Sequence, residues 1–253
     1  MSTKLLAAAA AAAALLGLVS TALAGAPARG PTGKNFLVLQ VKVSPPRPGQ
    51  GVAVEFDSFA GNDIDGQLPP ANDSTRTNDV RLAKGSKLNS SLFASCTRAD
   101  IDRNRCSRAS QVATGTATAD ARPTIANRVP AKVTAFNGKT AAGKPALLIR
   151  AVATLNGQQV PLVLVAEIKP AASGFGPSVV VDNGPLTSSG SGPLFGIVQL
   201  HLNFPDKVVR VRGRAVHYLV TPPTCRGSWL YEQVNTSYGG AKLIATDRVP
   251  CVR

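Results

Sequence analysis

The sequence predicts an all-β protein, a large antiparallel β-sandwich of jelly-roll or immunoglobulin-like type with roughly 11 to 13 strands. Three observations lead to this prediction. Short runs of branched apolar residues recur along the chain, and turn-forming Gly, Pro and Asn separate these runs. No convincing helical pattern follows the N-terminus, so little or no helix is expected there. A collagen-like rod is excluded because the 23 Gly and 19 Pro follow no repeat.

Residues 36–43 predict the first long strand, because apolar side chains recur there at every second position. The prolines within 45–48 end that strand, since proline cannot donate to a β-ladder. A long polar loop is expected at 62–78. The other expected strands are 52–56, 111–119, 146–155, 158–168, 197–204, 208–220, 229–238 and 242–246.

The clearest hairpin signal joins residues 146–155 to residues 158–168. Asn156–Gly157 stands between these two runs, and this dipeptide favours a two-residue type I′ turn in which both residues have positive φ. The same dipeptide at Asn137–Gly138 and at Asn183–Gly184 predicts two more turns.

The N-terminus has the parts of a secretory signal peptide. Lys4 gives a positive start, residues 5–19 are an uninterrupted apolar run, and Ala22–Ala24 offers the small residues that signal peptidase reads. Cleavage is expected after Ala24, which makes the protein secreted, either extracellular or associated with the cell envelope. The apolar run is shorter than the roughly 20 residues of a spanning helix, so no transmembrane segment is expected.

A single domain is expected after the signal peptide of residues 1–24 and a flexible Gly/Pro/Ala-rich leader at 25–34. Residues 35–253 show no break in composition, which favours one sandwich. Two packed sandwiches that divide near residue 125 are the alternative. Cleavage removes one Lys and no acidic residue, so the net charge changes from +14 to +13.

Four cysteines in an exported chain predict two disulfides. Three pairings are possible, and the local one, Cys96–Cys106 with Cys225–Cys251, is the simplest. A metal site is disfavoured because the chain has no Cys-x-x-Cys and its two His lie at no ligand spacing to a Cys. No metal and no cofactor are therefore expected.

Cys, Pro, Gly and strand residues form a pattern along most of the chain. Its parts are 82–89, 92–96, Ile101, Cys106, 110–112, 115–117, 218–225, 227–229 and Pro250–Cys251. This pattern resembles a group of uncharacterised secreted, Cys-paired all-β proteins of GC-rich actinobacteria, from about residue 35 to the C-terminus. The resemblance implies an all-β fold and export. Its motifs contain no catalytic signature, so it implies no activity.

Catalytic motifs are absent from the sequence, so the protein is not expected to be an enzyme. There is no Gly-x-Ser-x-Gly elbow, no His-Glu-x-x-His and no phosphate-cradling glycine loop. His201 is expected to point outward between Gln199 and Asn203. His217 is expected to be packed, with a hydrogen-bonded ring.

Two weaker site hypotheses concern the acidic residues. Glycoside hydrolysis needs two carboxylates across a scissile bond, and the only glutamates are Glu55, Glu167 and Glu232. A calcium loop is suggested by the Asp-rich stretch that begins near Asp63, but Ser74 stands where a bidentate Glu is required. Clustered Asp and Asn are ordinary turn formers, so neither hypothesis is preferred.

The basic residues form the preferred candidate site. Arg210, Arg212 and Arg214 alternate with apolar or small residues, so a single strand at 208–220 would present all three on one face. Such a face is typical of electrostatic attachment to an anionic surface. A second basic cluster surrounds the first Cys pair, where Asp100 and Asp102 offer partners that would make it an ordinary solvated face.

The function expected from these observations is that of a secreted non-catalytic β-sandwich protein that binds or decorates an anionic envelope or extracellular surface. The partner would be an anionic cell-envelope polymer or a lipid surface. Nucleic acid is not expected to be read specifically, because aromatic interleaving and a recognition helix are both missing. The alternatives are a secreted glycan-acting hydrolase and a carrier that encloses an apolar ligand between its sheets.

Overall fold

The computed structural model of the chain describes residues 28–29, 35–62, 75–120, 128–172, 174–183 and 196–252. Several expectations concern residues outside these ranges. They are the signal peptide at 1–24, most of the leader at 25–34, Asp63 and Ser74 of the suggested calcium loop, and Gly184 of the third Asn-Gly turn.

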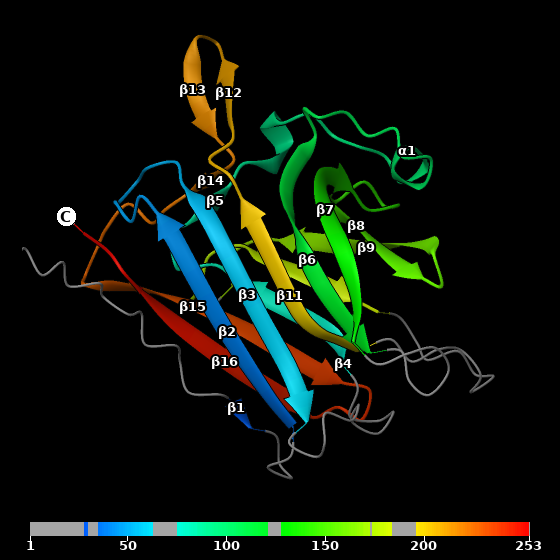
Figure 1. Cartoon of the computed structure of the whole chain (residues 1–253). Helices are drawn as coiled ribbons and strands as arrows, with labels where there is room; N and C mark the ends of the chain where they lie inside the picture. The colour runs from blue at the N-terminus through cyan, green and yellow to red at the C-terminus, as the bar shows by residue number, and fades with distance from the viewer. Residues whose placement is uncertain are drawn as a thin grey trace, which may run out of the picture.

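The prediction of an all-β fold is confirmed. Twelve described strands form one antiparallel sheet, in the order β1-β2-β3-β11-β6-β7-β8-β9-β10-β4-β15-β16 (Figure 1). Their bounds are β1 Ala28–Arg29, β2 Asn35–Ser44, β3 Ala53–Asn62, β4 Thr75–Arg81, β6 Gln111–Asp120, β7 Val129–Lys139, β8 Pro145–Leu155, β9 Gln158–Lys169, β10 Ser178–Asp182, β11 Gly196–Phe204, β15 Ser228–Ser237 and β16 Lys242–Pro250.

The connections at one end of this sheet contain several short strands and helical turns. Two small two-stranded sheets pair β12 with β13 and β5 with β14, and the helical elements of the described residues are the turn η2 and the five-residue helix α1. Their bounds are β5 Lys87–Leu88, η2 Ser90–Leu92, α1 Arg98–Asp102, β12 Val208–Val211, β13 Arg214–His217 and β14 Leu219–Val220.

The main sheet curls until its last strand lies against its second, so that one continuous sheet, nearly a barrel, takes the place of the two sheets of the expected sandwich (Figure 1). One side-chain contact and one backbone contact help to close the seam at β2 and β16. The backbone N–H of Val41 donates to Asp247 Oδ2 at 2.7 Å, and the N–H of Val252 donates to the carbonyl of Pro46 at 2.9 Å. Strands from both sides of residue 125 alternate in the sheet, since β11 lies between β3 and β6.

The core fills the inside of this curled sheet. On β2 the alternating apolar side chains from Leu37 to Val43 are buried, as their period of two predicts. Small residues let the strands approach one another: a Cβ at Gly115 of β6 would lie 1.8 Å from the carbonyl oxygen of His201 on β11. The packed inner face therefore fixes the strand positions from which the connections at each end project.

Two of the expected turns have different outcomes. Asn156 and Gly157 have φ of 49° and 78° and join β8 to β9, which confirms the type I′ hairpin. The turn predicted at Asn137–Gly138 is wrong, because both residues lie inside β7. There the buried Nδ2 of Asn137 donates to the carbonyls of Ser90, Phe93 and Ala94 at 2.9 to 3.3 Å, so distant partners override the local turn preference.

The expected polar loop at 62–78 is also too long. Residues 75–78 belong to β4, which pairs with β10 on one side and β15 on the other. Val80 is the only branched apolar residue of β4, so the strand carries a weak sequence signal and is held by its two neighbours.

Candidate functional site

The three arginines of the candidate site lie on a projecting hairpin and not on one strand face, which corrects the prediction. The hairpin consists of β12 and β13, and it turns at Arg212 and Gly213, whose φ values are 50° and 78°. Arg210 pairs with Ala215 and Arg214 with Val211, which places Arg210 and Arg214 on opposite faces. All three side chains are exposed, and none has an ion-pair partner among the described residues.

The base of the hairpin is held by specific contacts. Nδ1 of His217 lies 2.7 Å from Oδ1 of Asp206, which confirms the expected hydrogen-bonded ring. This ring lies against Gly51: a Cβ added at Gly51 would come within 1.8 Å of Nδ1 of His217. The next residue, Tyr218, is buried, and its hydroxyl donates to Asn137 Oδ1 at 3.2 Å. The arginines therefore project from a well-anchored base.

Lys207 connects this base to the loop that carries the first disulfide. Its ammonium donates to the carbonyl of Arg108 at 3.2 Å and to the carbonyl of Gln111. Partial burial lowers the pKa of Lys207 from its ordinary value. The contact makes the hairpin and the disulfide loop parts of one surface.

Connections at one end of the curled sheet carry most of the excess positive charge. We call this surface the basic end and define it by residues 45–52, 82–110, 140–144, 170–177 and 205–227, with Lys139 at its edge. Counted without Lys139, which belongs to β7, these connections contain thirteen Lys and Arg against three Asp. Their net charge is therefore +10, out of +14 for the chain. The connections described at the opposite end, 156–157 and 238–241, contain no charged residue.

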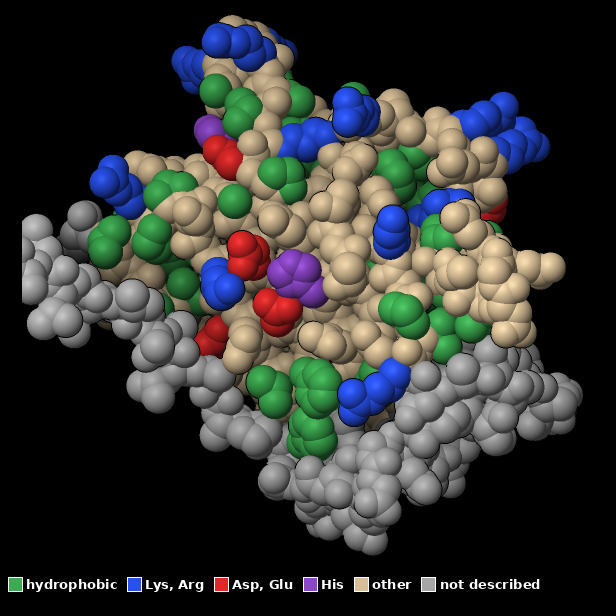
Figure 2. Space-filling view, in the orientation of Figure 1, with side chains coloured by type: hydrophobic (Ala, Val, Ile, Leu, Met, Phe, Trp, Pro, Cys, Tyr) green, Lys and Arg blue, Asp and Glu red, His purple; other side chains and the backbone are tan. Residues whose placement is uncertain are grey.

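Each of the three aspartates at the basic end is already paired. Asp102 lies 2.9 Å from Arg98, Asp100 lies 3.8 Å from Arg105, and Asp206 contacts His217. Many Lys and Arg side chains visible in Figure 2 lie on the projecting hairpin and along the upper rim. Most of the positive charge of the basic end is thus left for an external partner.

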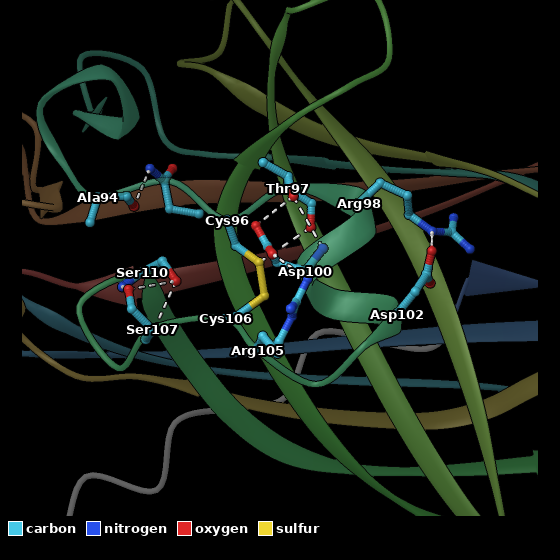
Figure 3. The surroundings of a disulfide bond; sticks show 11 residues. Ala94, Cys96, Thr97, Arg98, Asp100, Asp102, Arg105, Cys106, Ser107 and Ser110 are labelled. Carbon is cyan, nitrogen blue, oxygen red and sulfur yellow. Dashed lines mark hydrogen bonds and ion pairs between the residues drawn. A yellow bond between two sulfur atoms is a disulfide. The ribbon is translucent and has the colours of Figure 1, made fainter.

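Both predicted disulfides are present, in the local pairing. Cys96 is bonded to Cys106, and Cys225 is bonded to Cys251. Figure 3 shows the first disulfide beside α1. Thr97 caps this helix by accepting the N–H of Asp100 at 3.1 Å, and Nε of Arg98 donates to both carboxylate oxygens of Asp102 at 2.9 and 3.0 Å. The two disulfides indicate that the protein works in an oxidising, extracellular environment.

A hollow of about 350 Å³ lies beside the first disulfide. Two cations and three hydroxyl side chains line it, together with the disulfide and two apolar residues. The lining residues are Ser95, Cys96, Thr97, Arg98, Lys139, Thr140, Ala141 and Val165. It is open to solvent and belongs to the basic end.

The outer face of β2, β3 and β11 carries a separate polar cluster. His201 points outward, as predicted, and its Nδ1 lies 2.7 Å from Oδ1 of Asp57 on the neighbouring strand. Beside this pair, Lys42 lies 3.2 Å from Glu55. Asp57 and Glu55 each contact a partner within the cluster, so both carboxylates are already engaged there.

The three glutamates considered for glycoside hydrolysis lie on different strands and each contacts a cation. Glu55 is on β3, Glu167 is on β9 within 3.2 Å of Lys144, and Glu232 is on β15 within 2.7 Å of Arg81. β9 and β15 are three strand spacings apart, roughly 14 Å along the sheet, and Glu167 and Glu232 are also out of register with each other. The described structure does not bring these carboxylates together.

Two further features concern the described residues only. They contain no group of three His, Cys, Asp or Glu side chains placed to hold a metal ion. None of their helices has the length and apolar character needed to cross a membrane.

Comparisons with known proteins give no match. No family model fits the chain, and searches of the curated proteins and of the solved structures find nothing significantly similar. The resemblance to secreted actinobacterial β-proteins therefore rests on the sequence motifs alone.

Several residues of the basic end were not predicted as site residues. Lys207 and Lys139 stand out, because one links the hairpin to the disulfide loop and the other lines the hollow. Arg47 and Arg226 add charge from two further connections. Only the topology brings these residues together, so no local pattern could identify them, although the excess of base over acid pointed to the kind of partner.

Proposed function

We propose that this is a secreted, non-catalytic protein that binds an anionic polymer or lipid surface of the cell envelope or extracellular space through its basic end. The observation that carries the proposal is the segregation of charge: +10 of the net +14 lies in the connections at one end. A surface of one sign attracts polyanions over a distance set by the ionic strength, about 8 to 10 Å in physiological salt.

The hairpin supports the proposal through its shape and its free charges. Arg210, Arg212 and Arg214 are exposed on the projecting hairpin and have no ion-pair partner in the described part of the chain, and guanidinium groups favour bidentate contacts with phosphate or carboxylate. Arginines on two faces and at the tip suit contact with several groups of one polymer. Binding of this kind is sensitive to salt and has low sequence specificity.

The experiment compares charge reversal at the basic end with charge reversal elsewhere. The test variant is Arg210→Glu/Arg212→Glu/Arg214→Glu. The control is Lys132→Glu/Lys242→Glu/Arg248→Glu, which changes the net charge equally at exposed residues of β7 and β16. The probes are inorganic polyphosphate and vesicles of phosphatidylglycerol, with phosphatidylcholine vesicles as the neutral reference.

We expect the hairpin variant to bind an anionic probe at least about tenfold more weakly at low salt, since three charge-assisted contacts are lost. The control variant should lose about threefold or less, because its changed charges act only through long-range attraction. Equal losses in both variants would show that net charge alone acts. Absence of binding to every anionic probe would refute the proposal.

A further inference from the structure

We propose that the hollow beside the Cys96–Cys106 disulfide binds the phosphate group of a phosphate-bearing polyol or sugar unit, and that this unit belongs to the polymer held by the basic end. The inference rests on the proposed function and specifies its ligand. It assigns a defined subsite to a surface that otherwise attracts anions only by its overall charge.

The chemistry of the lining favours a tetrahedral oxyanion. Lys139 lines the hollow, is exposed and has no ion-pair partner among the described residues. Arg98 uses Nε for Asp102, so its Nη donors are left for a ligand (Figure 3). The hydroxyls of Ser95 and Thr140 add donors. A phosphate monoester can use such a set of donors, because its three terminal oxygens share up to two negative charges and all accept hydrogen bonds.

The size and floor of the hollow indicate more than a bare ion. Its 350 Å³ lies at the lower end of the volumes that enclose small ligands. Val165, Ala141 and Cys96 give the lining an apolar part, which a carbon skeleton can cover. A phosphate on a three- to six-carbon polyol or sugar matches this combination of charge and apolar contact.

The lining is held in place before a ligand arrives. Cys96 is 4% exposed, and its N–H donates to the carbonyl of Asn137 at 2.8 Å, which joins the 95–98 segment to β7. The disulfide fixes the other side of this segment. The pairing of Arg98 with Asp102 limits the positions of its guanidinium, so less conformational entropy is lost on binding.

The loop that supplies Cys96, Thr97 and Arg98 to the hollow also contacts the base of the arginine hairpin. Lys207, at the base of the hairpin, donates to the carbonyl of Arg108, two residues beyond Cys106. Arg103, Arg105 and Arg108 are exposed on the segment that follows the lining residues 95–98 in the chain. A linear polymer can therefore contact the hairpin and the hollow at once, which raises its affinity above that of a single unit.

A soluble polymer fits this end better than a bilayer does. Proteins that lie on a membrane present aromatic or other apolar side chains to the interface. At the basic end the rings of Phe93 and Tyr218 are buried in the core, and among its described residues only Leu92 and Val208 are large apolar side chains with more than 40% exposure. We therefore assign the phosphate to a polymer and treat a lipid headgroup as an outcome that the experiment must exclude.

The experiment titrates the protein with glycerol 3-phosphate while backbone amide signals are followed by NMR, with glycerol as the uncharged reference. We expect glycerol 3-phosphate, and not glycerol, to shift the amides of Ser95, Thr97 and Thr140. Lys139→Gln should weaken this binding about tenfold, since a charge-assisted contact is lost. The matched control Arg103→Gln, at an exposed residue outside the lining, should change it less than twofold. Because Lys139 is exposed, the thermal midpoint of Lys139→Gln should equal that of the parent protein.

The outcomes separate this inference from the proposed function. If polyphosphate binds but glycerol 3-phosphate does not, or if Lys139→Gln has no effect, the subsite is refuted and the proposed function stands. If neither probe binds, both fail. If Lys139→Gln weakens binding to phosphatidylglycerol vesicles while polyphosphate binding is unchanged, the assignment to a polymer is overturned in favour of a lipid headgroup.

Discussion

The carboxylate of Asp247 accepts the backbone N–H of Val41 at 2.7 Å and so joins the last strand of the sheet to the second. Both residues are buried, at 5% and 4% exposure. A side chain makes this contact where a closed barrel would have a ladder of backbone pairs. The curled shape, and with it the gathering of the connections at one end, depends on contacts of this kind.

Removing the Asp247 carboxylate is expected to destabilise the seam. Asp247→Ala leaves the N–H of Val41 without a partner in a buried place, which costs about 1.5 to 3 kcal/mol. Asp247→Asn keeps an acceptor oxygen and should lose less. Urea unfolding measures both free energies, with Thr246→Ala at the exposed neighbouring position as the control. Equal stability of all four proteins would show that the seam does not need this bond.

Gly51 is expected to be required by the ring of His217. A Cβ at Gly51 would lie 1.8 Å from Nδ1 of that ring, so Gly51→Ala must displace either the ring or the chain. We expect a loss of about 1 to 3 kcal/mol, typical of overpacking, and recovery of much of it in Gly51→Ala/His217→Ala. Thermal unfolding of the two single variants and the double variant gives the coupling energy. Strictly additive losses would contradict the contact.

Alkaline pH is expected to destabilise the protein through two buried phenols. Burial raises the pKa of Tyr218 and of Tyr231 above the ordinary value of 10.0. Above pH 10 the unfolded chain ionises while the folded chain stays protonated, so stability falls as pH rises. Each tyrosine contributes a loss of about 1.4 kcal/mol at pH 11.

Tyr231→Phe separates the two contributions. Urea midpoints at pH 8 and pH 11 should differ less in this variant than in the parent protein, because one of the two phenols is gone. The comparison is made within each protein, so any change of stability at pH 8 cancels. The same alkaline loss in both proteins would show that Tyr231 ionises as freely in the folded state as in the unfolded state.

The two disulfides are expected to have different roles. Chain-entropy estimates give about 3 kcal/mol for Cys96–Cys106 and about 3.5 kcal/mol for Cys225–Cys251, which closes a longer loop. Replacing Cys96 and Cys106 with Ala should abolish the binding of glycerol 3-phosphate, since Cys96 lines the hollow and its bond to Cys106 holds the lining segment in place. Replacing Cys225 and Cys251 should lower stability and leave that binding in place. The reverse pattern would place the phosphate elsewhere.

Local signals predicted much of this fold and tertiary contacts decided the rest. The period of two in β2 and the Asn156–Gly157 turn were predicted, because both patterns act within a few residues. The Asn137–Gly138 turn was not found, since the amide of Asn137 bonds to carbonyls more than forty residues away. The single sheet also depends on distant pairings, such as that of β11 with β3 and β6.

The candidate site was predicted only in part. The arginines at 210, 212 and 214 and the local pairing of the cysteines were visible in the sequence. The turn at Arg212–Gly213 was missed, because arginine is uncommon at positive φ and an apolar/basic alternation also fits a longer strand. Lys207 and Lys139 come from other connections, so only the curled sheet places them on the same end.

The central claim, that the basic end binds anionic polymers, is tested most directly by mapping where polyphosphate contacts the protein. Amide hydrogen exchange is compared with and without polyphosphate at low salt. We predict slower exchange in residues 95–110 and 205–217, no change in residues 129–135 of β7 or in β16, and loss of the effect in high salt. Slower exchange centred on residues 129–135 or on β16, or no change anywhere, would contradict the account.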